Sequence, residues 1–352
     1  MIGRICGTGS CLPRTVWTNE KLEELVDTSG QWIEERTGIC ERHIAEEEET
    51  TAYLASEAAK EAVLDSGLKA QDIDLILVAT ISPGRVMPGV ACEVQKNIGA
   101  SNATCFDLNA ACTGFLFALN TAQAYIRAGI YKTILVVGAE SMSRLVDWSD
   151  RSTSVLFGDG AGALILKAEE GDHYWQTGHS DGTKDFVLTL RSKSLFEEQD
   201  DNPKDVLSKS DEGSSVEEHD DVSKNAEDIS RKKKSHKTGI CMDGQEVFKF
   251  AVRKVPELTE ELLEKSGLKI ADIDFFILHQ ANERIVKAAA KKLKVDMSRF
   301  PINMENYANT SAASIPILLD ELVQTGRLRK GQKILLAGFG AGLTWAGSIL
   351  EW

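Results

Sequence analysis

The sequence lacks the features that would indicate a membrane, a metal or a nucleic acid as partner. No apolar run reaches the roughly 18 residues that a membrane-spanning helix needs. The seven cysteines are irregularly spaced and include no C-x-x-C pair, which argues against a disulfide framework and against zinc. A net charge of -14 argues against general nucleic-acid binding. Because the first six residues favour a strand over a signal peptide, we expect a reduced, cytoplasmic protein.

The composition is that of a soluble globular protein. The chain has 352 residues, of which 42% are hydrophobic and 27% are charged. This length allows one large domain or two ordinary ones with a substantial core.

Two segments of the chain recur at a constant offset of 200 residues. The stretch "SGLKAQDIDLILVAT" (66–80) returns as "SGLKIADIDFFILHQ" (266–280), and "KTILVVGAE" (132–140) returns as "QKILLAGFG" (332–340). Two matches at one spacing indicate an internal duplication. We therefore predict two related halves, 1–170 and 171–352.

The apolar runs in these repeats predict buried strands. Continuous apolar stretches are typical of strands that are covered on both faces, so the predicted architecture is a layered α/β fold. The predicted strands are 73–79, 133–138, 273–278 and 333–338.

A further pair of segments suggests how the halves meet. Residues 112–129 and 309–326 both begin with small polar residues and end at a glycine. Aligned in this way, Cys112 falls opposite Asn309. We expect two equivalent helix N-termini, related by a pseudo-twofold axis, to bring these residues towards one site.

Residues 193–238 interrupt this pattern. They are dense in Asp, Glu, Lys and Ser, and such a segment buries too little apolar surface to offset its ordering entropy. We predict a flexible surface insertion; a partner-binding tail is the alternative.

Cys112 and His279 are candidate reactive residues. A cysteine at a helix N-terminus meets free N–H groups and a partial positive charge, which stabilise the thiolate and make it nucleophilic. His279 ends an apolar strand, where α/β sheets tend to carry ligand sites. The alternatives are a small buried thiol and a structural histidine, and Asn309 taken alone could be a simple helix cap.

Neither glycine-rich stretch matches a nucleotide site. "GDGAGA" (158–163) runs into the predicted strand "LILK", whereas the dinucleotide fingerprint must open a helix. "GFGAGLTW" (338–345) lacks the Gly-Lys-Ser/Thr of a P-loop; it is either an anion-binding nest or a tight structural turn.

Together these motifs resemble β-ketoacyl-acyl carrier protein synthase III. The resemblance rests on "ACTGF" around Cys112, "HQAN" at 279–282, "ANTSAASIP" at 308–316, "GFGAGLTW" at 338–345 and "ERTGICERHIA" at 35–45. It implies a thiolase-like fold with five layers, αβαβα, built from two duplicated halves and assembled as a homodimer. It also implies that neither metal nor cofactor is required.

The resemblance implies a mechanism. Cys112 would take the acyl group from an acyl-CoA, and malonyl-acyl carrier protein would then enter and lose CO2. His279 and Asn309 would donate hydrogen bonds to the enolate oxygen, while the backbone N–H groups of Cys112 and Ala341 would form an oxyanion hole at the acyl-cysteine.

The resemblance also implies binding roles, each with a plain structural alternative in packing or solvation. Coenzyme A would contact Trp32, Arg36, Arg151, Phe248 and Asn282. Met87, reaching across the dimer, and Phe339 would bound the acyl pocket. Lys249, Arg284, Lys287, Lys291 and Lys292 would form a docking surface for the acidic carrier protein.

Other members of the fold fit less well. A biosynthetic thiolase needs a second late cysteine, chain-elongating synthases need a second histidine where Asn309 stands, and hydroxymethylglutaryl-CoA synthase needs a glutamate near its cysteine. A secondary-metabolism relative with another acyl group or acceptor is the main alternative, and a non-catalytic acyl-CoA binding protein is a second. The sequence does not specify the starter acyl group.

Overall fold

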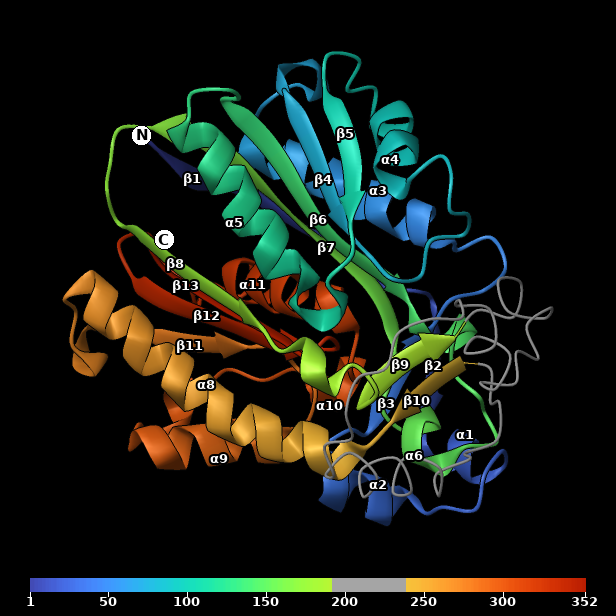
Figure 1. Cartoon of the computed structure of the whole chain (residues 1–352). Helices are drawn as coiled ribbons and strands as arrows, with labels where there is room; N and C mark the ends of the chain where they lie inside the picture. Colours follow the sequence, from blue (N-terminus) through green and yellow to red (C-terminus); the bar gives the residue numbers. More distant parts are fainter. Residues whose placement is uncertain (192–238) are drawn as a thin grey trace, which may run out of the picture.

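The computed structural model describes residues 1–191 and 239–352, and its elements form five layers in the order α, β, α, β, α. The predicted insertion at 193–238 lies outside the described residues. Figure 1 shows the two sheets with a helical layer between them and further helices on their outer faces. The predicted thiolase-like fold with two related halves is confirmed.

The N-terminal half forms a five-stranded sheet with strand order β1-β7-β6-β4-β5. β4 runs parallel to β5 and β6, whereas β7 runs antiparallel to β6 and β1. The strands are β1 (Ile2–Cys11), β4 (Leu75–Ala79), β5 (Thr104–Leu108), β6 (Thr133–Ser141) and β7 (Asp159–Glu169). β7 begins at the second residue of the "GDGAGA" segment, which therefore forms a strand and opens no helix.

The C-terminal half forms a four-stranded sheet with order β11-β12-β13-β8. β11 and β12 are parallel, and β13 is antiparallel to both of its neighbours. The strands are β8 (Tyr174–Ser180), β11 (Phe275–Leu278), β12 (Lys333–Gly340) and β13 (Thr344–Glu351). All four predicted strands are present, although β4 and β11 begin two residues later than expected.

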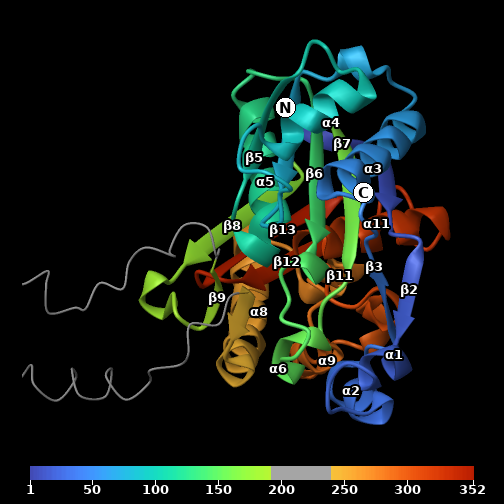
Figure 2. The same ribbon diagram turned by 90° about the vertical axis from the view of Figure 1, so that its right-hand side faces the viewer.

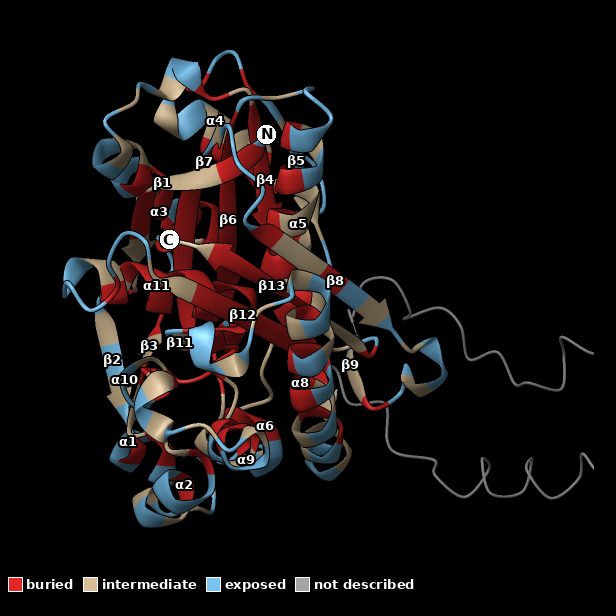
Figure 3. Ribbon diagram, turned by 90° about the vertical axis from the view of Figure 1, so that its left-hand side faces the viewer, coloured by how far each residue is buried: buried red, intermediate tan, exposed pale blue. Residues whose placement is uncertain are grey.

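Six helices build the three helical layers. α5 (Gly114–Arg127) and α11 (Ser314–Gln324) lie between the sheets, where they pack against apolar side chains of both. α3 (Thr51–Ser66) and α4 (Val90–Ile98) cover the outer face of the N-terminal sheet, while α8 (Gly244–Ser266) and α9 (Glu283–Leu293) cover that of the C-terminal sheet. Figure 3 shows the central strands of the two sheets as buried, β8 as partly exposed, and the outer helices as exposed on one side.

Smaller elements gather at one end of the layered body, as Figure 2 shows. They are β2 (Thr15–Thr18), β3 (Glu41–Ile44), β9 (Leu188–Arg191), β10 (Gly239–Met242), α1 (Asn19–Glu23), α2 (Gly30–Thr37), α6 (Arg151–Ser154) and α10 (Met304–Tyr307). In the part of the chain described here, no helix combines the length and apolar character needed to span a membrane.

The repeated residues have matching structural roles in the two halves. Gly67 and Gly267 end α3 and α8 in the left-handed conformation, with φ of 67° and 70°, which favours glycine. Asp74 accepts a hydrogen bond from the Thr133 N–H at 2.9 Å, and Asp274 accepts one from the Lys333 N–H at 2.7 Å. Each aspartate thereby connects the start of one strand to the start of its parallel neighbour, β4 to β6 and β11 to β12.

The predicted alignment of Cys112 with Asn309 is wrong. Short 3-10 turns, η2 (Ala111–Thr113) and η8 (Ser311–Ala313), precede α5 and α11. The first residue of each turn has a positive φ, 48° at Ala111 and 50° at Ser311. The helix starts therefore keep the offset of 200, and Cys112 corresponds to Ala312.

The misalignment has a simple physical origin. α11 has 11 residues where α5 has 14, so its terminal glycine comes early relative to the start of the helix. Matching the final glycines shifted the register by three residues. Asn309 lies just before η8, so the helix starts still bring it close to Cys112.

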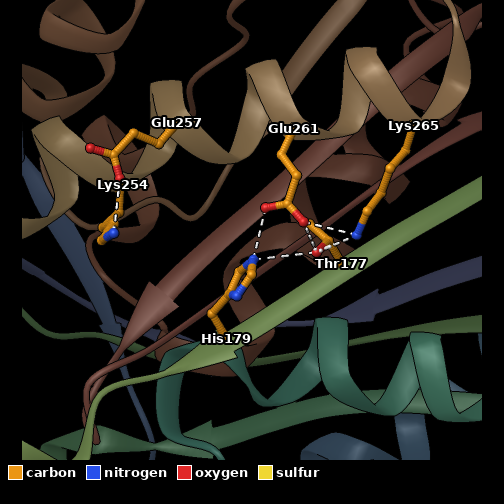
Figure 4. Close-up of polar contacts among 6 residues, drawn as sticks. All are labelled: Thr177, His179, Lys254, Glu257, Glu261 and Lys265. Carbon is orange, nitrogen blue, oxygen red and sulfur yellow. Dashed lines mark hydrogen bonds and ion pairs between the residues drawn. The ribbon is translucent and has the colours of Figure 1, made fainter.

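A polar cluster fastens α8 to the edge of the C-terminal sheet (Figure 4). The carboxylate of Glu261 contacts Thr177 at 2.5 Å, His179 at 2.7 Å and Lys265 at 2.8 Å. The ring of His179 stacks on Trp345, with centroids 5.3 Å apart. Partial burial raises the pKa of Glu261, but the hydrogen bonds from Lys265, Thr177 and His179 outweigh it and lower the pKa from 4.5 to about 2.

Candidate active site

Three predicted catalytic side chains, Cys112, His279 and Asn309, line one cavity of about 580 Å³. They come from different elements, because Cys112 lies in η2, His279 directly follows β11, and Asn309 precedes η8. All three are nearly inaccessible, with exposed fractions of 9%, 2% and 6%.

The Cys112 thiol lies in the turn that leads into α5, as predicted. Its predicted low pKa is wrong, however. Burial, reinforced by the nearby Glu140 carboxylate, raises the pKa of the thiol to about 12, and hydrogen bonds from Ser311 and from the Cys112 backbone lower it only in part. Cys112 is therefore a protonated thiol in the free chain, and a nucleophilic attack must remove its proton.

His279 is held in a defined orientation. Its Nδ1 lies 2.7 Å from Ser314 Oγ, and its ring meets Phe339 edge-on with centroids 5.3 Å apart. Burial lowers the pKa of His279 to about 3, so the ring is neutral at physiological pH. The Gln280 N–H donates to Ser314 Oγ at 3.3 Å, which leaves the Ser314 proton free to be donated to Nδ1. In that tautomer, Nε2–H is a hydrogen-bond donor.

Asn309 is fixed through its backbone and through one side-chain atom. Its N–H donates to the Leu156 carbonyl at 2.9 Å, and its carbonyl accepts from the Gly158 N–H at 3.1 Å. Its Oδ1 accepts from the Ser311 N–H at 2.9 Å. The amide group is thereby oriented, and Nδ2 has no recorded protein partner among residues 1–191 and 239–352.

Of the two predicted oxyanion-hole residues, Cys112 lies in η2 and Ala341 lies in the turn that follows β12. A Cβ added to Gly340 would lie 3.0 Å from the backbone nitrogen of Cys112, so the turn packs directly on the nucleophile. Ala341 follows Gly340 and lines a neighbouring hollow of about 710 Å³ instead of the Cys112 cavity. Phe339 lines the Cys112 cavity beside His279.

The five predicted coenzyme A contacts line this same cavity. The Arg151 guanidinium lies over the Trp32 ring, 4.9 Å from its centroid, and Arg36 follows Trp32 by one turn of α2. Asn282 caps α9 by accepting from the Arg284 N–H at 2.9 Å, and its Nδ2 donates to the Arg36 carbonyl at 3.0 Å.

The two ends of the cavity differ in charge and in exposure. Arg36 and Arg151 are exposed, whereas Cys112, His279 and Asn309 are buried. Phe248 lies between these groups in exposure and also lines the cavity. A ligand with an anionic end and a reactive thioester end would match this arrangement.

The predicted docking residues are exposed near this cationic end. Arg284, Lys287 and Lys291 share one face of α9, and Lys292 is beside them. The Arg284 guanidinium lies 5.5 Å from the centroid of the Phe248 ring. Two of these cations have acidic neighbours, because Lys287 pairs with Glu283 at 2.7 Å and Lys249 pairs with Glu246 at 3.0 Å.

Met87 does not reach the Cys112 cavity of its own chain. Its side chain is 84% exposed, and the adjacent Val86 is 92% exposed. Phe106, on the edge strand β5, is also exposed. Because these apolar side chains are exposed, Met87 and its neighbours are free to contact another copy of the chain.

Sequence reasoning missed Glu140, Ser311 and Ser314, which surround the catalytic residues. Glu140 is the penultimate residue of the buried strand β6, and the repeat places it opposite Gly340. A carboxylate at the end of a fully apolar run was the available signal. Ser311 and Ser314 lie within the quoted "ANTSAASIP" motif, where they resemble ordinary helix-start residues.

No three His, Cys, Asp or Glu side chains are grouped to hold a metal ion in residues 1–191 and 239–352. The expectation that the chain needs neither metal nor cofactor stays a prediction.

The free cysteines include Cys92 and Cys105, whose sulfur atoms lie 3.4 Å apart.

The fold and the cavity place the chain among thiolase-fold acyltransferases that catalyse condensation. Two family models match it: 3-oxoacyl-[acyl-carrier-protein] synthase III over residues 106–182 and the C-terminal model of that enzyme over 263–352. A β-ketoacyl-[acyl-carrier-protein] synthase III of Clostridium acetobutylicum is 47% identical over 350 residues, which cover 99% of this chain and 98% of the relative. The chain belongs to the β-ketoacyl-[acyl-carrier-protein] synthase III family.

Two solved structures illustrate the range of similar proteins. The 3-oxoacyl-[acyl-carrier-protein] synthase III from Aquifex aeolicus VF5 is 39% identical with a TM-score of 0.84, covering 99% of this chain and 100% of that one. The priming β-ketosynthase from the R1128 polyketide biosynthetic pathway is 33% identical with a TM-score of 0.84, covering 99% and 96%.

Proposed function

We propose that this enzyme transfers a short acyl group from coenzyme A to Cys112 and condenses it with malonyl-acyl carrier protein, the initiating step of fatty acid synthesis. The products are 3-oxoacyl-acyl carrier protein, CO2 and CoA. The observation that carries the proposal is the meeting of Cys112, His279 and Asn309 at the buried end of a cavity whose other end is cationic.

In the first half-reaction, Cys112 attacks the thioester carbonyl of the acyl-CoA. The Trp32–Arg151 pair suits an adenine face and its phosphates, and Arg36 adds a second positive charge. The backbone N–H groups of Cys112 and Ala341 stabilise the tetrahedral oxyanion in this proposal. The packing of Gly340 on the Cys112 backbone supports a fixed geometry between the turn and the nucleophile.

In the second half-reaction, malonyl-acyl carrier protein replaces CoA and loses CO2. The resulting enolate oxygen accepts hydrogen bonds from His279 Nε2–H and Asn309 Nδ2, and the enolate carbon then attacks the acyl-cysteine. A neutral His279 suits this role as a donor, because its low pKa keeps it from acting as an imidazolium acid.

Carrier-protein docking on α9 forms part of the same proposal. The exposed cations Arg284, Lys287, Lys291 and Lys292, with Lys249 on α8, offer a positive surface beside the cavity on a chain of net charge -14. Complementary charge on an acidic carrier protein would increase the association rate and orient the complex.

We include homodimer assembly in the proposal because of one edge of the N-terminal sheet. β5 is an edge strand with Phe106 exposed, and Val86 and Met87 are highly exposed. Such an edge invites pairing with another strand. Met87 of one subunit would then help to bound the acyl pocket of its partner. Phe106→Lys should convert a dimer to monomers in light scattering, and an unchanged dimer would exclude this interface.

A priming ketosynthase of secondary metabolism is the second candidate. The 33% identity to such an enzyme over 99% of this chain supports keeping it. A panel of acyl-CoA primers and acceptors, compared by kcat/KM, separates the two. The cytoplasmic location stays a prediction.

Separate assays of the two half-reactions test the proposed division of roles. His279→Ala or Asn309→Ala should slow malonyl decarboxylation and condensation about 100-fold, because one lost oxyanion donor costs about 3 kcal/mol. Acylation of Cys112 by acetyl-CoA should change far less. Asn306→Ala, an exposed position on α10, serves as the matched control. Equal losses in both half-reactions would contradict the assignment.

A further inference from the structure

The buried carboxyl group of Glu140 acts electrostatically on the Cys112 thiol, and the mechanism above leaves it without a role. It is fully buried at the end of β6. Its Oε2 accepts from Ser82 Oγ at 2.5 Å and from Thr80 Oγ1 at 3.2 Å. The Ile81 N–H also donates to both carboxylate oxygens, at 3.1 and 3.3 Å.

Ser311 connects this carboxyl group to Cys112. Its hydroxyl donates to Glu140 Oε1 at 3.1 Å, and the same hydroxyl is close enough to the Cys112 thiol to influence its pKa. With its own proton directed at Glu140, the Ser311 oxygen is free to accept the thiol proton. The residue is fully buried, and its backbone is fixed by the hydrogen bond from its N–H to Asn309 Oδ1. A continuous path from sulfur to hydroxyl to carboxylate therefore lies within the protein interior.

Acylation of Cys112 requires an acceptor for the proton of its thiol, and this path leads to one. Cys112 is a protonated thiol in the free chain, and the sulfur must lose its proton to form the thioester. His279 contacts Ser314 through Nδ1, and the proposed mechanism uses its Nε2–H as a donor. Neither nitrogen is then available as the base.

The other titratable groups around Glu140 do not offer an alternative acceptor. On β7, Asp159 accepts from Ser143 N–H, Ser143 Oγ and the Ala45 N–H, which occupy both carboxylate oxygens. Arg144, on the turn after β6, acts electrostatically on Asp159. The groups reaching Glu140 from β4 and η8 are hydroxyls and a backbone N–H.

We propose that Glu140 accepts the Cys112 proton through the Ser311 hydroxyl during acylation and returns it when the thiolate is released by condensation. The inference rests on the proposed function, since it assigns the proton of the same half-reaction. Glu140 touches the reacting thiol only through Ser311, so both residues act as a proton relay.

The relay balances over a full cycle. The Cys112 S–H bond breaks as the proton passes to Ser311 Oγ, and the Ser311 proton passes to Glu140 Oε1. The sulfur lone pair forms the bond to the acyl carbon, and CoA leaves as a thiolate that takes a proton from solvent. Condensation later expels the Cys112 thiolate, which recovers the proton from Glu140 by the reverse path. One proton is consumed overall, and it ends on CoA.

The pKa of Glu140 suits its proposed role as acceptor and donor of the proton. Burial raises the pKa of Glu140 from 4.5 to about 7, although four donors oppose the shift. The carboxyl group can therefore hold or release a proton near neutral pH, where general acid–base catalysis is most effective.

The test measures single-turnover acylation by acetyl-CoA in wild type, Glu140→Gln and Ser311→Ala. Both variants should acylate about 100-fold more slowly, the lower end of the contribution of general base catalysis. The wild-type rate should level off above about pH 7, where Glu140 is ionised. In Glu140→Gln it should continue to rise with pH, because it then depends on direct ionisation of the thiol.

Asp159→Asn is the matched control, since it removes another buried, fully hydrogen-bonded carboxylate one strand away. It should leave the acylation rate and its pH profile unchanged, and melting temperatures check folding. If Glu140 acts only as a fixed negative charge, Glu140→Gln would speed acylation, which would overturn the relay. A wild type that no short-chain acyl-CoA acylates would contradict the proposed function instead.

Discussion

Replacing Gly340 by alanine tests how closely the glycine-rich turn fixes the nucleophile. The added Cβ would lie 3.0 Å from the Cys112 nitrogen, 3.2 Å from its Cβ and 3.4 Å from its Cα. All three atoms belong to the backbone or its first side-chain carbon, so no flexible side chain can move aside. We expect Cys112 and its N–H to shift by a few tenths of an ångström.

The magnitude follows from the size of this shift. Overpacking a well-packed interior costs about 1–3 kcal/mol. Because a misplacement of about 1 Å can cost roughly 100-fold in rate, a smaller shift should slow acylation about tenfold. Intact-protein mass spectrometry after rapid quenching measures the acetyl-enzyme, and calorimetry measures Tm.

Gly338→Ala is the control on the same strand. Its nearest neighbour would be Leu116 Cδ1 at 3.0 Å, the flexible end of a side chain, and the Cys112 carbonyl oxygen is 3.8 Å away. This variant should lose some stability but little acylation rate. Wild-type acylation in Gly340→Ala would refute the view that the turn positions the nucleophile.

Four further changes have defined outcomes. Cys112→Ser should give no acylated protein by mass spectrometry after incubation with acetyl-CoA, because a serine hydroxyl ionises far less readily than a thiol; an acylated variant at the wild-type rate would exclude Cys112. Replacing residues 193–238 by a two- to four-residue Gly/Ser linker should leave the condensation rate unchanged and Tm within about 2 °C of the wild type. The reason is that β9 and β10 already pair where the linker would join them, and that the length of a loop has a small effect on stability. A large drop in Tm would show that the segment stabilises the fold. Glu261→Gln should reduce the free energy of unfolding at pH 7 by about 1 kcal/mol or less. Because the pKa of Glu261 in the folded protein lies below 4.5, the wild type should lose this advantage as the pH falls from about 4.5 towards 2. Urea denaturation that gives the same difference in unfolding free energy between wild type and variant at every pH would contradict this linkage. Reversing Arg284 and Lys291 to Glu should raise KM for malonyl-acyl carrier protein roughly tenfold and weaken its salt dependence, with a much smaller effect on acylation by the CoA thioester. Unchanged carrier kinetics would place docking elsewhere.

The layered fold could be predicted from the sequence because the duplication left strong local signals. The repeated glycines and aspartates have backbone roles that few other residues can fill, so they survive in both halves at one offset. The alignment failed at the helix between them. α11 is three residues shorter than α5, and nothing in the sequence of either helix shows where this difference in length lies.

The candidate site was predictable where motifs are local. Cys112, His279 and Asn309 each stand in a short characteristic stretch, and the structure places them on one cavity. Their electrostatics were not predictable in this way. The helix terminus favours a thiolate at Cys112, but the opposing burial and the Glu140 carboxylate come from elements that only tertiary structure brings together.

The backbone bridge at Asn309 has a consequence for how the enzyme gains and loses activity. Through Leu156 and Gly158, the N-terminal half holds the backbone of Asn309, a proposed catalytic residue that belongs to the C-terminal half. A fragment ending at residue 191 would carry the nucleophile without its amide partner, and the complementary fragment would carry an amide without its anchor. Catalytic competence is therefore a property of the joined halves, and a nascent or partly unfolded chain stays inert until they dock.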